Sequence, residues 1–420
     1  MNFLLKFSFL SLVIVSLSGQ SFANSSCSKV FRENGKLNLN RKLNLDVETV
    51  LPGPIAEYID PGLVVLSGFF LNPYLIEMHR AIISHLPEGV RALMLLPKPE
   101  KSDPNGDRAI TEIYEQDFKD LIQANKVEFV LVPLKKNYDV NQHGNWTRDF
   151  LSQFAVDKQG QILLMNFKYG RPDADNTDAF VQKYLVEKIE RASGKKIKTL
   201  NVPFYFEWGN ISTDGEGNVF VSERVLQNNA ADNISEKKVS DWFRGVFGEH
   251  TELHFVKDVA TESTGHVDMY MKFLDAKNVL VAKAPEEFKE WNQALDLLAK
   301  QLEGLGKTVQ RIEMALDSKE IDLLENSSKK DREETLKRIP FRSYTNSVAT
   351  KDIAEIPHYD SESDNLKKFD ANALKIYQKF GLKAYQIGSQ SSIVDGGSIH
   401  CLSSVIPNFE KIISKLFKKP

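Results

Sequence analysis

Short apolar runs recur along this chain, and each has the length of a β-strand and is bounded by polar or turn-forming residues. Six runs carry this pattern, at residues 62–66, 92–96, 127–132, 162–165, 219–221 and 279–281. Between several of them lie stretches with helical spacing of apolar residues, at 75–85, 109–125, 179–193, 287–305, 371–380 and 409–417. The alternation of strands and helices predicts an α/β protein.

No Pro/Ser-rich linker or low-complexity segment divides the chain, so residues 45–420 are expected to form one catalytic domain after a lead-in at residues 24–44. Residues 318–338 are dense in charge and predict an exposed helix or loop. The basic, amphipathic tail at 411–419 predicts a surface helix that packs on the body of the protein rather than a membrane anchor.

The first 23 residues have the pattern of a secretory signal. Lys6 supplies a positive start, residues 7–17 are largely apolar, and Ser21-Phe22-Ala23 resembles a cleavage site. This apolar run is too short to span a bilayer, and no other stretch of about 18 apolar residues occurs. We therefore expect export, to the periplasm or the extracellular medium, and no membrane span.

Composition narrows the class of protein. Of 420 residues, 42% are hydrophobic and 26% are charged, which is typical of a globular protein. A formal net charge of −3 gives no general attraction to nucleic acid or anionic membranes. With only two cysteines, Cys27 and Cys401, the chain is not a disulfide-stapled scaffold.

Cys401 ends the run Asp395-Gly396-Gly397-Ser398-Ile399-His400-Cys401, and two charged motifs precede it. These are Trp146-Thr147-Arg148-Asp149 and Gly265-His266-Val267-Asp268. If the second motif is a strand, alternation puts His266 and Asp268 on one face. A thiol, an imidazole and two carboxylates are the groups needed to attack a planar, cationic carbon such as that of a guanidinium.

Each motif also has a simpler interpretation. Cys401 can pair with Cys27 or serve as a small buried hydrophobe. Arg148 and Asp149 can form a surface ion pair beside a core tryptophan, and His266 with Asp268 can be read as a weak metal site.

A further segment, Glu207-Trp208-Gly209-Asn210, leads into a predicted hairpin around Asp214-Gly215. Asp214, Glu216 and Asn218 superficially resemble a calcium loop, but the closing ligands are missing, so a plain turn is expected.

Together with Arg342-Ser343-Tyr344-Thr345-Asn346-Ser347, these motifs resemble the agmatine deiminase and bacterial (Porphyromonas-type) peptidylarginine deiminase family of the guanidino-group-modifying superfamily. The resemblance covers roughly residues 45–410. It implies a fold of five ββαβ-type units, arranged pseudo-symmetrically as an α/β propeller around a central active-site cleft.

The resemblance also implies roles for single residues. It makes Cys401 the nucleophile, His266 the acid and base, and Asp149 and Asp268 the carboxylates that hold the guanidinium. The implied substrate-binding residues are Trp146, Asn346, Glu207 and Asn210. Trp208 stands where the family has glycine, and Phe150-Leu151-Ser152 replaces its usual Gly-Pro. These two departures are expected to alter the cleft walls.

The sequence therefore predicts hydrolytic deimination through a covalent thiouronium intermediate, with no metal or organic cofactor. Export favours peptidyl-arginine as the substrate, converted to citrulline and ammonia. The alternatives are agmatine, converted to N-carbamoylputrescine, an amidino transfer, a metal-dependent hydrolase, and a non-catalytic protein that binds guanidinium or a partner. The oligomeric state stays open.

Overall fold

The computed structural model describes residues 51–408, except 60, 70, 101–105, 134–144, 152, 169–176, 194–196, 260–263, 329–330, 332–334, 337–338 and 360–362. The described residues all belong to one compact unit, Leu39–Pro420. The predicted signal (1–23), the lead-in (24–44), Cys27 and the predicted helix at 409–417 lie outside the described residues.

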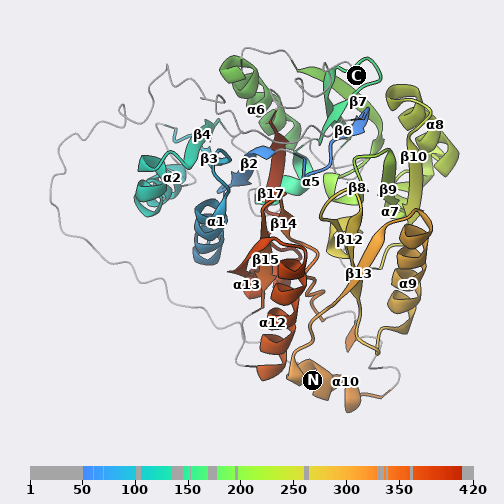
Figure 1. Cartoon of the computed structure of the whole chain (residues 1–420). Helices are drawn as coiled ribbons and strands as arrows, with labels where there is room; N and C mark the ends of the chain where they lie inside the picture. The colour runs from blue at the N-terminus through green and yellow to red at the C-terminus, as the bar shows by residue number, and fades with distance from the viewer. Residues whose placement is uncertain are drawn as a thin grey trace, which may run out of the picture. The chain divides into compact units, whose positions relative to one another are not determined.

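Within the described residues, the strands form five separate sheets (Figure 1). The first contains β1 (Gly53–Pro54), β5 (Gln153–Val156), β6 (Ile162–Lys168) and β7 (Lys198–Tyr205). The next three are β8 (Ile211–Thr213), β9 (Asn218–Ser222) and β10 (Glu252–Val256); β11 (Met271–Phe273), β12 (Asn278–Lys283) and β13 (Thr308–Glu313); and β14 (Val348–Ala349), β15 (Ile353–His358) and β16 (Lys383–Gly388). The fifth is β17 (Ser403–Pro407), β2 (Pro61–Ser67), β3 (Arg91–Pro97) and β4 (Val127–Val132).

The same pairing recurs in all five sheets of the described chain. An antiparallel pair is followed by a parallel pair: β5-β6-β7, β8-β9-β10, β11-β12-β13, β14-β15-β16 and β17-β2-β3. A parallel pair needs a crossover connection, and here it is helical. The crossovers contain α6 (Thr177–Ser193), α7 (Arg224–Asn228) with α8 (Glu236–Phe247), α9 (Lys289–Gly304), α12 (Asp364–Lys379) and α1 (Pro73–His85). The predicted α/β class is confirmed.

Shorter helices complete the described chain: α2 (Asp107–Asp117), α3 (Lys119–Gln123), α5 (Thr147–Phe150), α10 (Ser318–Glu325), α13 (Gln390–Val394) and the 3-10 helices η1 (Trp208–Asn210), η2 (Ala230–Asp232) and η3 (Val267–Met269). All six predicted strands are present. The helical stretch predicted at 109–125 is present as two helices, α2 and α3. They are separated at Phe118, which leaves the helical conformation and whose fully buried ring packs near Tyr114 and Phe129.

Burial of apolar side chains drives this arrangement. One core cluster joins β2, β3 and β4 to α1 and α2, and a second joins β6, β7 and β9 to α8. Ser235 caps the N-terminus of α8, where its side chain accepts a hydrogen bond from the Lys238 backbone, and the helix buries Val239, Phe243 and Phe247. The crossover helices thus pack on the sheets, and some of them also contact a neighbouring unit, as α1 contacts β16 and α12 contacts β13.

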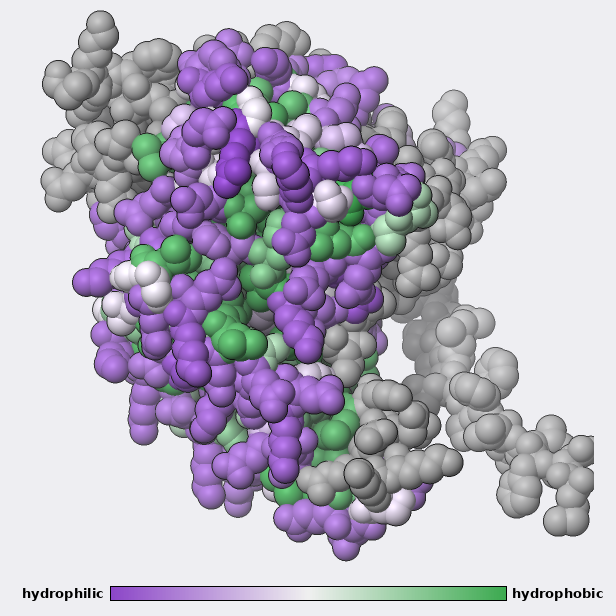
Figure 2. Space-filling view, turned by 90° about the vertical axis from the view of Figure 1, so that its right-hand side faces the viewer, coloured by the Kyte–Doolittle hydropathy of each residue, from purple (hydrophilic) through white to green (hydrophobic). Residues whose placement is uncertain are grey.

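The face that carries α8 and α9 is mostly hydrophilic, with smaller hydrophobic areas between the polar side chains (Figure 2). None of the helices in the described ranges is both long enough and apolar enough to cross a membrane. The charge-dense segment expected at 318–338 begins with the helix α10, where Asp317 caps the N-terminus.

The predicted hairpin is confirmed, because β8 and β9 pair antiparallel across Asp214-Gly215. Asp214 and Glu216 face a cation that belongs to the chain itself. The Lys307 ammonium lies 2.6 Å from Asp214 and 2.9 Å from Glu216. The plain-turn interpretation therefore holds, with a lysine where a calcium loop would have its ion.

Candidate active site

The predicted site residues lie in five segments, and each segment comes shortly before the first strand of a repeated unit: β5, β8, β11, β14 or β17. Residues 146–149 precede β5, 207–210 precede β8, 265–268 precede β11, 343–347 precede β14, and 399–401 precede β17. Because the five units repeat, the predicted site residues lie at equivalent positions, just before the N-terminal end of the first strand of each unit.

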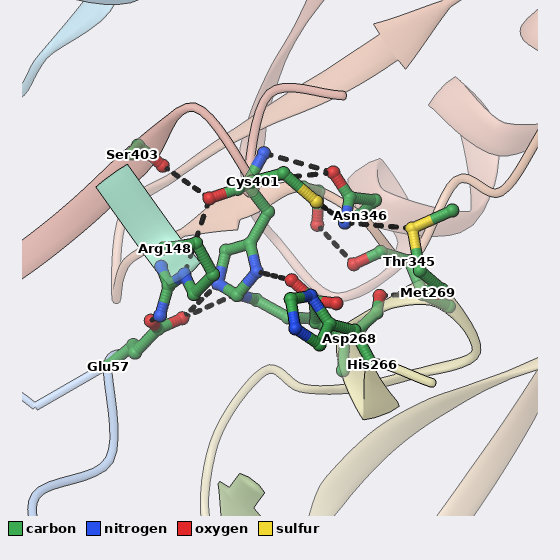
Figure 3. Close-up of polar contacts among 12 residues, drawn as sticks. Glu57, Arg148, His266, Asp268, Met269, Thr345, Asn346, Cys401 and Ser403 are labelled. Carbon is green, nitrogen blue, oxygen red and sulfur yellow. Dashed lines mark hydrogen bonds and ion pairs between the residues drawn. The ribbon is translucent and has the colours of Figure 1, made fainter. Parts of the chain in front are cut away.

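Cys401 carries a free thiol that is 4% exposed. The Asn346 amide Nδ2 lies 3.1 Å from its sulfur, and Asn346 Oδ1 accepts from the His400 backbone at 3.1 Å (Figure 3). Burial raises the pKa of the thiol to about 11; Asp268 adds to this effect and His266 opposes it. In the free site the thiol is therefore protonated at neutral pH.

His266 lies against Glu207, with 2.8 Å between Nε2 and Oε2, and its Nδ1 is 4.0 Å from the Asp149 carboxylate. Burial alone would lower the pKa of His266. Contacts with Cys401, Glu207 and Asp149 outweigh burial and raise this pKa well above its ordinary value. The ring is thus held as an imidazolium, the form that can donate a proton.

The strand predicted at His266 and Asp268 is wrong. Gly265 has a φ of +66°, a conformation that ends a strand, and residues 267–269 form the 3-10 helix η3. His266 and Asp268 nevertheless reach the same place, since donor atoms of His266, Asp268 and Cys401 all lie within 4.8 Å of one another.

Asp268 is 4% exposed, and its two carboxylate oxygens differ in their hydrogen bonds. His400 Nδ1 forms a short hydrogen bond to Oδ2, whereas Oδ1 is buried and has no hydrogen-bond partner among the described residues. Burial would raise the pKa of Asp268, but the His400 ring lowers it. An ionised carboxylate oxygen is therefore left open beside the thiol.

The Glu207-Trp208-Gly209-Asn210 segment fits around His266. The Asn210 Oδ1 accepts from the Glu207 backbone at 3.0 Å, and its Nδ2 donates to the Thr264 carbonyl at 3.0 Å. A Cβ atom at Gly209 would come within 2.2 Å of His266 Nδ1. Glycine at this position is what allows the imidazole to approach the backbone.

The short helix α5 is tied to the cysteine segment. The Arg148 backbone N–H donates to the Cys401 carbonyl at 3.1 Å, and the Thr147 hydroxyl donates to the Leu402 carbonyl at 2.8 Å. The half-buried Trp146 packs against Gly397, where a Cβ would come within 2.6 Å of the indole. These contacts hold Asp149 and Trp146 next to Cys401.

The sequence did not predict a layer of buried charges behind these residues. Arg148 is 0% exposed and pairs with Glu57, so the simpler interpretation, a surface ion pair of Arg148 and Asp149, is wrong. Lys272 Nζ also lies 2.8 Å from Glu57, and His400 Nε2 lies 2.5 Å from it. The position of Lys272 within the apolar run 269–274 was a signal in the sequence for a buried acidic partner such as Glu57, because a buried charge requires pairing.

The two family departures do not form exposed cleft walls. The Trp208 side chain is 3% exposed, and the Arg148 guanidinium carbon lies 5.0 Å from its ring centroid. Phe150 and Leu151 are also buried, whereas Ser152 is not described.

Beside this layer lies a small cavity of about 30 Å³, lined in part by Glu57, Trp208, Lys272 and His400. Its volume suits one or two water molecules rather than an organic ligand.

His266, Asp268 and Cys401 also form a group that could hold a divalent cation. A thiolate, an imidazole and a carboxylate are ordinary zinc ligands. Asp268 Oδ2 is already bonded to His400 and His266 Nε2 to Glu207, so the possible ligands that remain are one oxygen of Asp268, one nitrogen of His266 and the Cys401 sulfur.

Of the predicted site residues, Cys401, His266, Asp149, Asp268, Glu207 and Asn346 are brought together. Asn346 contacts the thiol, Asn210 braces the backbone, and Trp146 lines the cysteine segment. Their roles toward a substrate stay predictions.

Comparison with known proteins indicates a guanidino-group deiminase. The sequence model of the family described as Porphyromonas-type peptidyl-arginine deiminase matches residues 91–407. A Selenomonas ruminantium protein with the provisional name agmatine deiminase is 23% identical over 377 residues, which cover 84% of this chain and 92% of that protein. The agmatine deiminase of Pseudomonas fluorescens is 22% identical over 310 residues, with coverage of 67% and 79%.

Solved structures agree in fold. The C. jejuni agmatine deiminase superposes with a TM-score of 0.61 at 18% identity, covering 87% of this chain and 99% of that one. The Enterococcus faecalis agmatine deiminase gives 0.59 at 18% identity, with coverage of 84% and 95%.

Proposed function

This chain belongs to the Porphyromonas-type peptidyl-arginine deiminase family, whose model matches residues 91–407, and within the deiminase chemistry of this family we propose, from the names of its relatives, that its substrate is agmatine. It is a guanidino-group deiminase, a hydrolase that acts on C–N bonds other than peptide bonds. The proposed products are N-carbamoylputrescine and ammonia.

The choice of agmatine rests on the named relatives, which align with most of their own length and are agmatine deiminases by name. The sequence had favoured peptidyl-arginine because of the predicted export signal. Peptidyl-arginine stays the second candidate, favoured by the description of the matching family.

The observation that carries the proposed chemistry is the buried thiol of Cys401 beside the carboxylate and imidazole of Asp268 and His266. We propose that Asp149 and the open oxygen of Asp268 hold the guanidinium. Two carboxylates compensate a cation that would otherwise be destabilised by leaving water. Trp146 is proposed to offer its indole face to the flat cation.

Binding of this cation also changes the thiol. Its positive charge opposes the burial and the Asp268 carboxylate that raise the Cys401 pKa in the free site. The thiol then loses its proton to solvent, and the thiolate adds to the guanidinium carbon.

Proton transfer completes the proposed cycle. The His266 imidazolium protonates the departing nitrogen, the C–N bond breaks, and ammonia is released. A covalent S-alkylthiouronium remains on Cys401. The neutral His266 then takes a proton from water, whose oxygen attacks the same carbon. The C–S bond breaks, the hydroxyl of the intermediate gives its proton to solvent, and the ureido product and the thiolate are released. Once the product has left, the thiolate takes a proton from solvent and the free site is restored.

We further propose that the five ββαβ units are arranged pseudo-symmetrically as a propeller. The repeated strand pairing supports this proposal, as do the site segments at equivalent positions in all five units of the described chain. We also propose that residues 1–23 direct export and that residues 45–420 form the catalytic domain.

The test measures ammonia release from purified protein with agmatine, free arginine and an arginine peptide, each with a chelator present. We expect the highest kcat/KM for agmatine and no effect of the chelator. The matched variant Cys401→Ser is expected to fold and to release no ammonia. A preference for the peptide would replace agmatine, whereas activity in Cys401→Ser would overturn the thiol mechanism.

A further inference from the structure

His400 precedes the candidate nucleophile, and its ring lies between two carboxylates. Nδ1 contacts Asp268 Oδ2, and Nε2 lies 2.5 Å from Glu57 Oε2. The residue is 4% exposed, so these two contacts replace water at both ring nitrogens. The family resemblance assigned no role to this histidine.

Hydrogen-bonding chemistry determines the charge of this ring. An ionised carboxylate only accepts hydrogen bonds, so each contact requires a hydrogen on the ring nitrogen. Burial would raise the pKa of Glu57, yet Arg148, His400 and Lys272 hold it well below its ordinary value. The pKa of Asp268 is lowered as well, against burial, chiefly by His400. With both carboxyls ionised, the two contacts require a hydrogen-bond donor at each ring nitrogen of His400.

Glu57 anchors the ring from the far side. It also takes part in ion pairs with Arg148 (Figure 3) and with Lys272, and so three donors surround it. Arg148 in turn donates from Nε to the His400 carbonyl at 3.3 Å. The His400 ring is therefore held through its two ring nitrogens and through the backbone carbonyl of the same residue.

The consequence appears at Asp268. His400 occupies Oδ2, and the Asp268 backbone carbonyl accepts from the Thr345 hydroxyl at 3.1 Å. Rotation of the carboxylate is thereby restricted, and Oδ1, buried and without a partner among the described residues, is the oxygen left for a ligand. A carboxylate that is already oriented binds a planar donor without further ordering.

We infer that His400, anchored by Glu57, is a positioning residue that orients Asp268 so that Oδ1 accepts from the guanidinium of the substrate. This inference rests on the proposed function for the identity of the ligand. It deepens that function by naming the residue that orients one of the two carboxylates that hold the guanidinium. His400 acts through Asp268 and does not touch the reacting carbon.

Two conservative variants separate the contacts of the ring. In His400→Asn the amide nitrogen lies near the position of Nδ1, so the donor to Asp268 is kept and the contact with Glu57 is lost. In His400→Gln the amide reaches the position of Nε2, so the contact with Glu57 is kept and the donor to Asp268 is lost. A merely structural role of a buried ring would make the two variants alike.

Agmatine and benzoylarginine amide serve as probes in calorimetric binding to full-length Cys401→Ser protein, which does not turn them over. We expect His400→Asn to bind the better probe within about threefold of the parent and His400→Gln to lose about tenfold or more, the range of one charge-assisted hydrogen bond. The loss should vanish in an Asp268→Asn background. His79→Asn, which removes another fully buried histidine outside the site, should lower Tm without changing affinity.

Equal affinities in both His400 variants, or equal losses accompanied by equal drops in Tm, would overturn the inference. If His400→Gln does not fold, nitrogen NMR of the unsubstituted ring decides, with His400→Asn used to assign its signals. Two protonated ring nitrogens at about pH 7 agree with the positioning role, and a neutral ring contradicts it.

The two proposals fail separately. Binding with the stated His400 dependence but no ammonia release by the Cys401 protein would reject the proposed reaction and keep the positioning role. Turnover without any difference between the two His400 variants would do the reverse.

Discussion

At the scale of single residues, the Cys401 thiol is the group whose ionisation decides whether the site is reactive. Burial and Asp268 raise its pKa, and the His266 ring acts against them. Because the His266 pKa is itself raised well above its ordinary value, its imidazolium form is favoured at neutral pH. Both groups are therefore protonated in the free site at neutral pH, and a bound cation is needed to generate the thiolate.

This state predicts slow alkylation of the free protein. In a Cys27→Ala background, the reaction of Cys401 with iodoacetamide, a neutral reagent, should be slow at neutral pH and rise toward a pKa of about 11. Asp268→Asn should move the rise to lower pH, by about 1 pH unit, since it removes a charge that destabilises the thiolate. The measurement is the alkylation rate against pH, with the surface substitution Asp241→Asn as control.

Fast alkylation at neutral pH in the unliganded protein would instead indicate a preformed thiolate–imidazolium pair. An unchanged profile in Asp268→Asn would show that this carboxylate does not act on the thiol.

At the scale of elements, the site depends on the close approach of η1 to the segment that carries His266. The backbone at Gly209 lies directly against the imidazole. A side chain there has to displace the ring, and with it the contacts to Glu207 and Cys401.

Gly209→Ala is therefore expected to lower kcat/KM about 100-fold or more, the effect expected when a catalytic group is misplaced by about 1 Å. The matched control is Gly245→Ala in α8, where an added Cβ meets nothing within 4 Å. Kinetics of ammonia release and Tm are measured for both variants. Normal activity in Gly209→Ala would show that the ring adapts and that its position is not set by this glycine.

At the scale of the whole molecule, one buried acid makes stability depend on pH. Glu355 in β15 is 0% exposed, and neither of its carboxylate oxygens has a hydrogen-bond partner among the described residues. Burial raises its pKa well above the ordinary value, with Lys126 opposing. The folded chain thus keeps a proton that the unfolded chain releases.

Stability should accordingly be full below the unfolded pKa and decline as pH rises toward the folded pKa, since the unfolded state then binds fewer protons. Glu355→Gln should remove this decline. We expect similar Tm values at about pH 4 and a variant more stable by a few degrees at about pH 8. The exposed substitution Glu303→Gln is the control, and parallel Tm curves for the parent and Glu355→Gln would disprove the assignment.

The predicted export of the protein can be tested in cells. We expect a mature chain that begins near Asn24 outside the cytoplasm, because residues 7–17 have the apolar character of a signal. The measurement is cell fractionation followed by N-terminal sequencing. Val13→Asp should retain the precursor in the cytoplasm, whereas a chain begun at Asn24 should keep full activity with agmatine.

Local pattern was sufficient for much of this protein. The strands at 62–66, 92–96 and 127–132 were predictable because apolar runs of strand length bounded by turns have few other uses in a folded chain. The α/β class follows from their alternation with helices. The motifs around Cys401, His266 and Asp149 were also legible, since their residue types together suit attack on a cationic carbon.

What the sequence could not determine depends on contacts between residues far apart in the chain. The repeated ββαβ pairing is not visible as a sequence repeat, because the units share backbone pattern rather than side chains. Glu57 lies 343 positions from His400, and only folding brings its carboxylate against that ring and against Arg148 and Lys272. The ionisation of Cys401 and the orientation of Asp268 were likewise decided by tertiary structure, because burial and neighbouring charge, rather than residue type, set both.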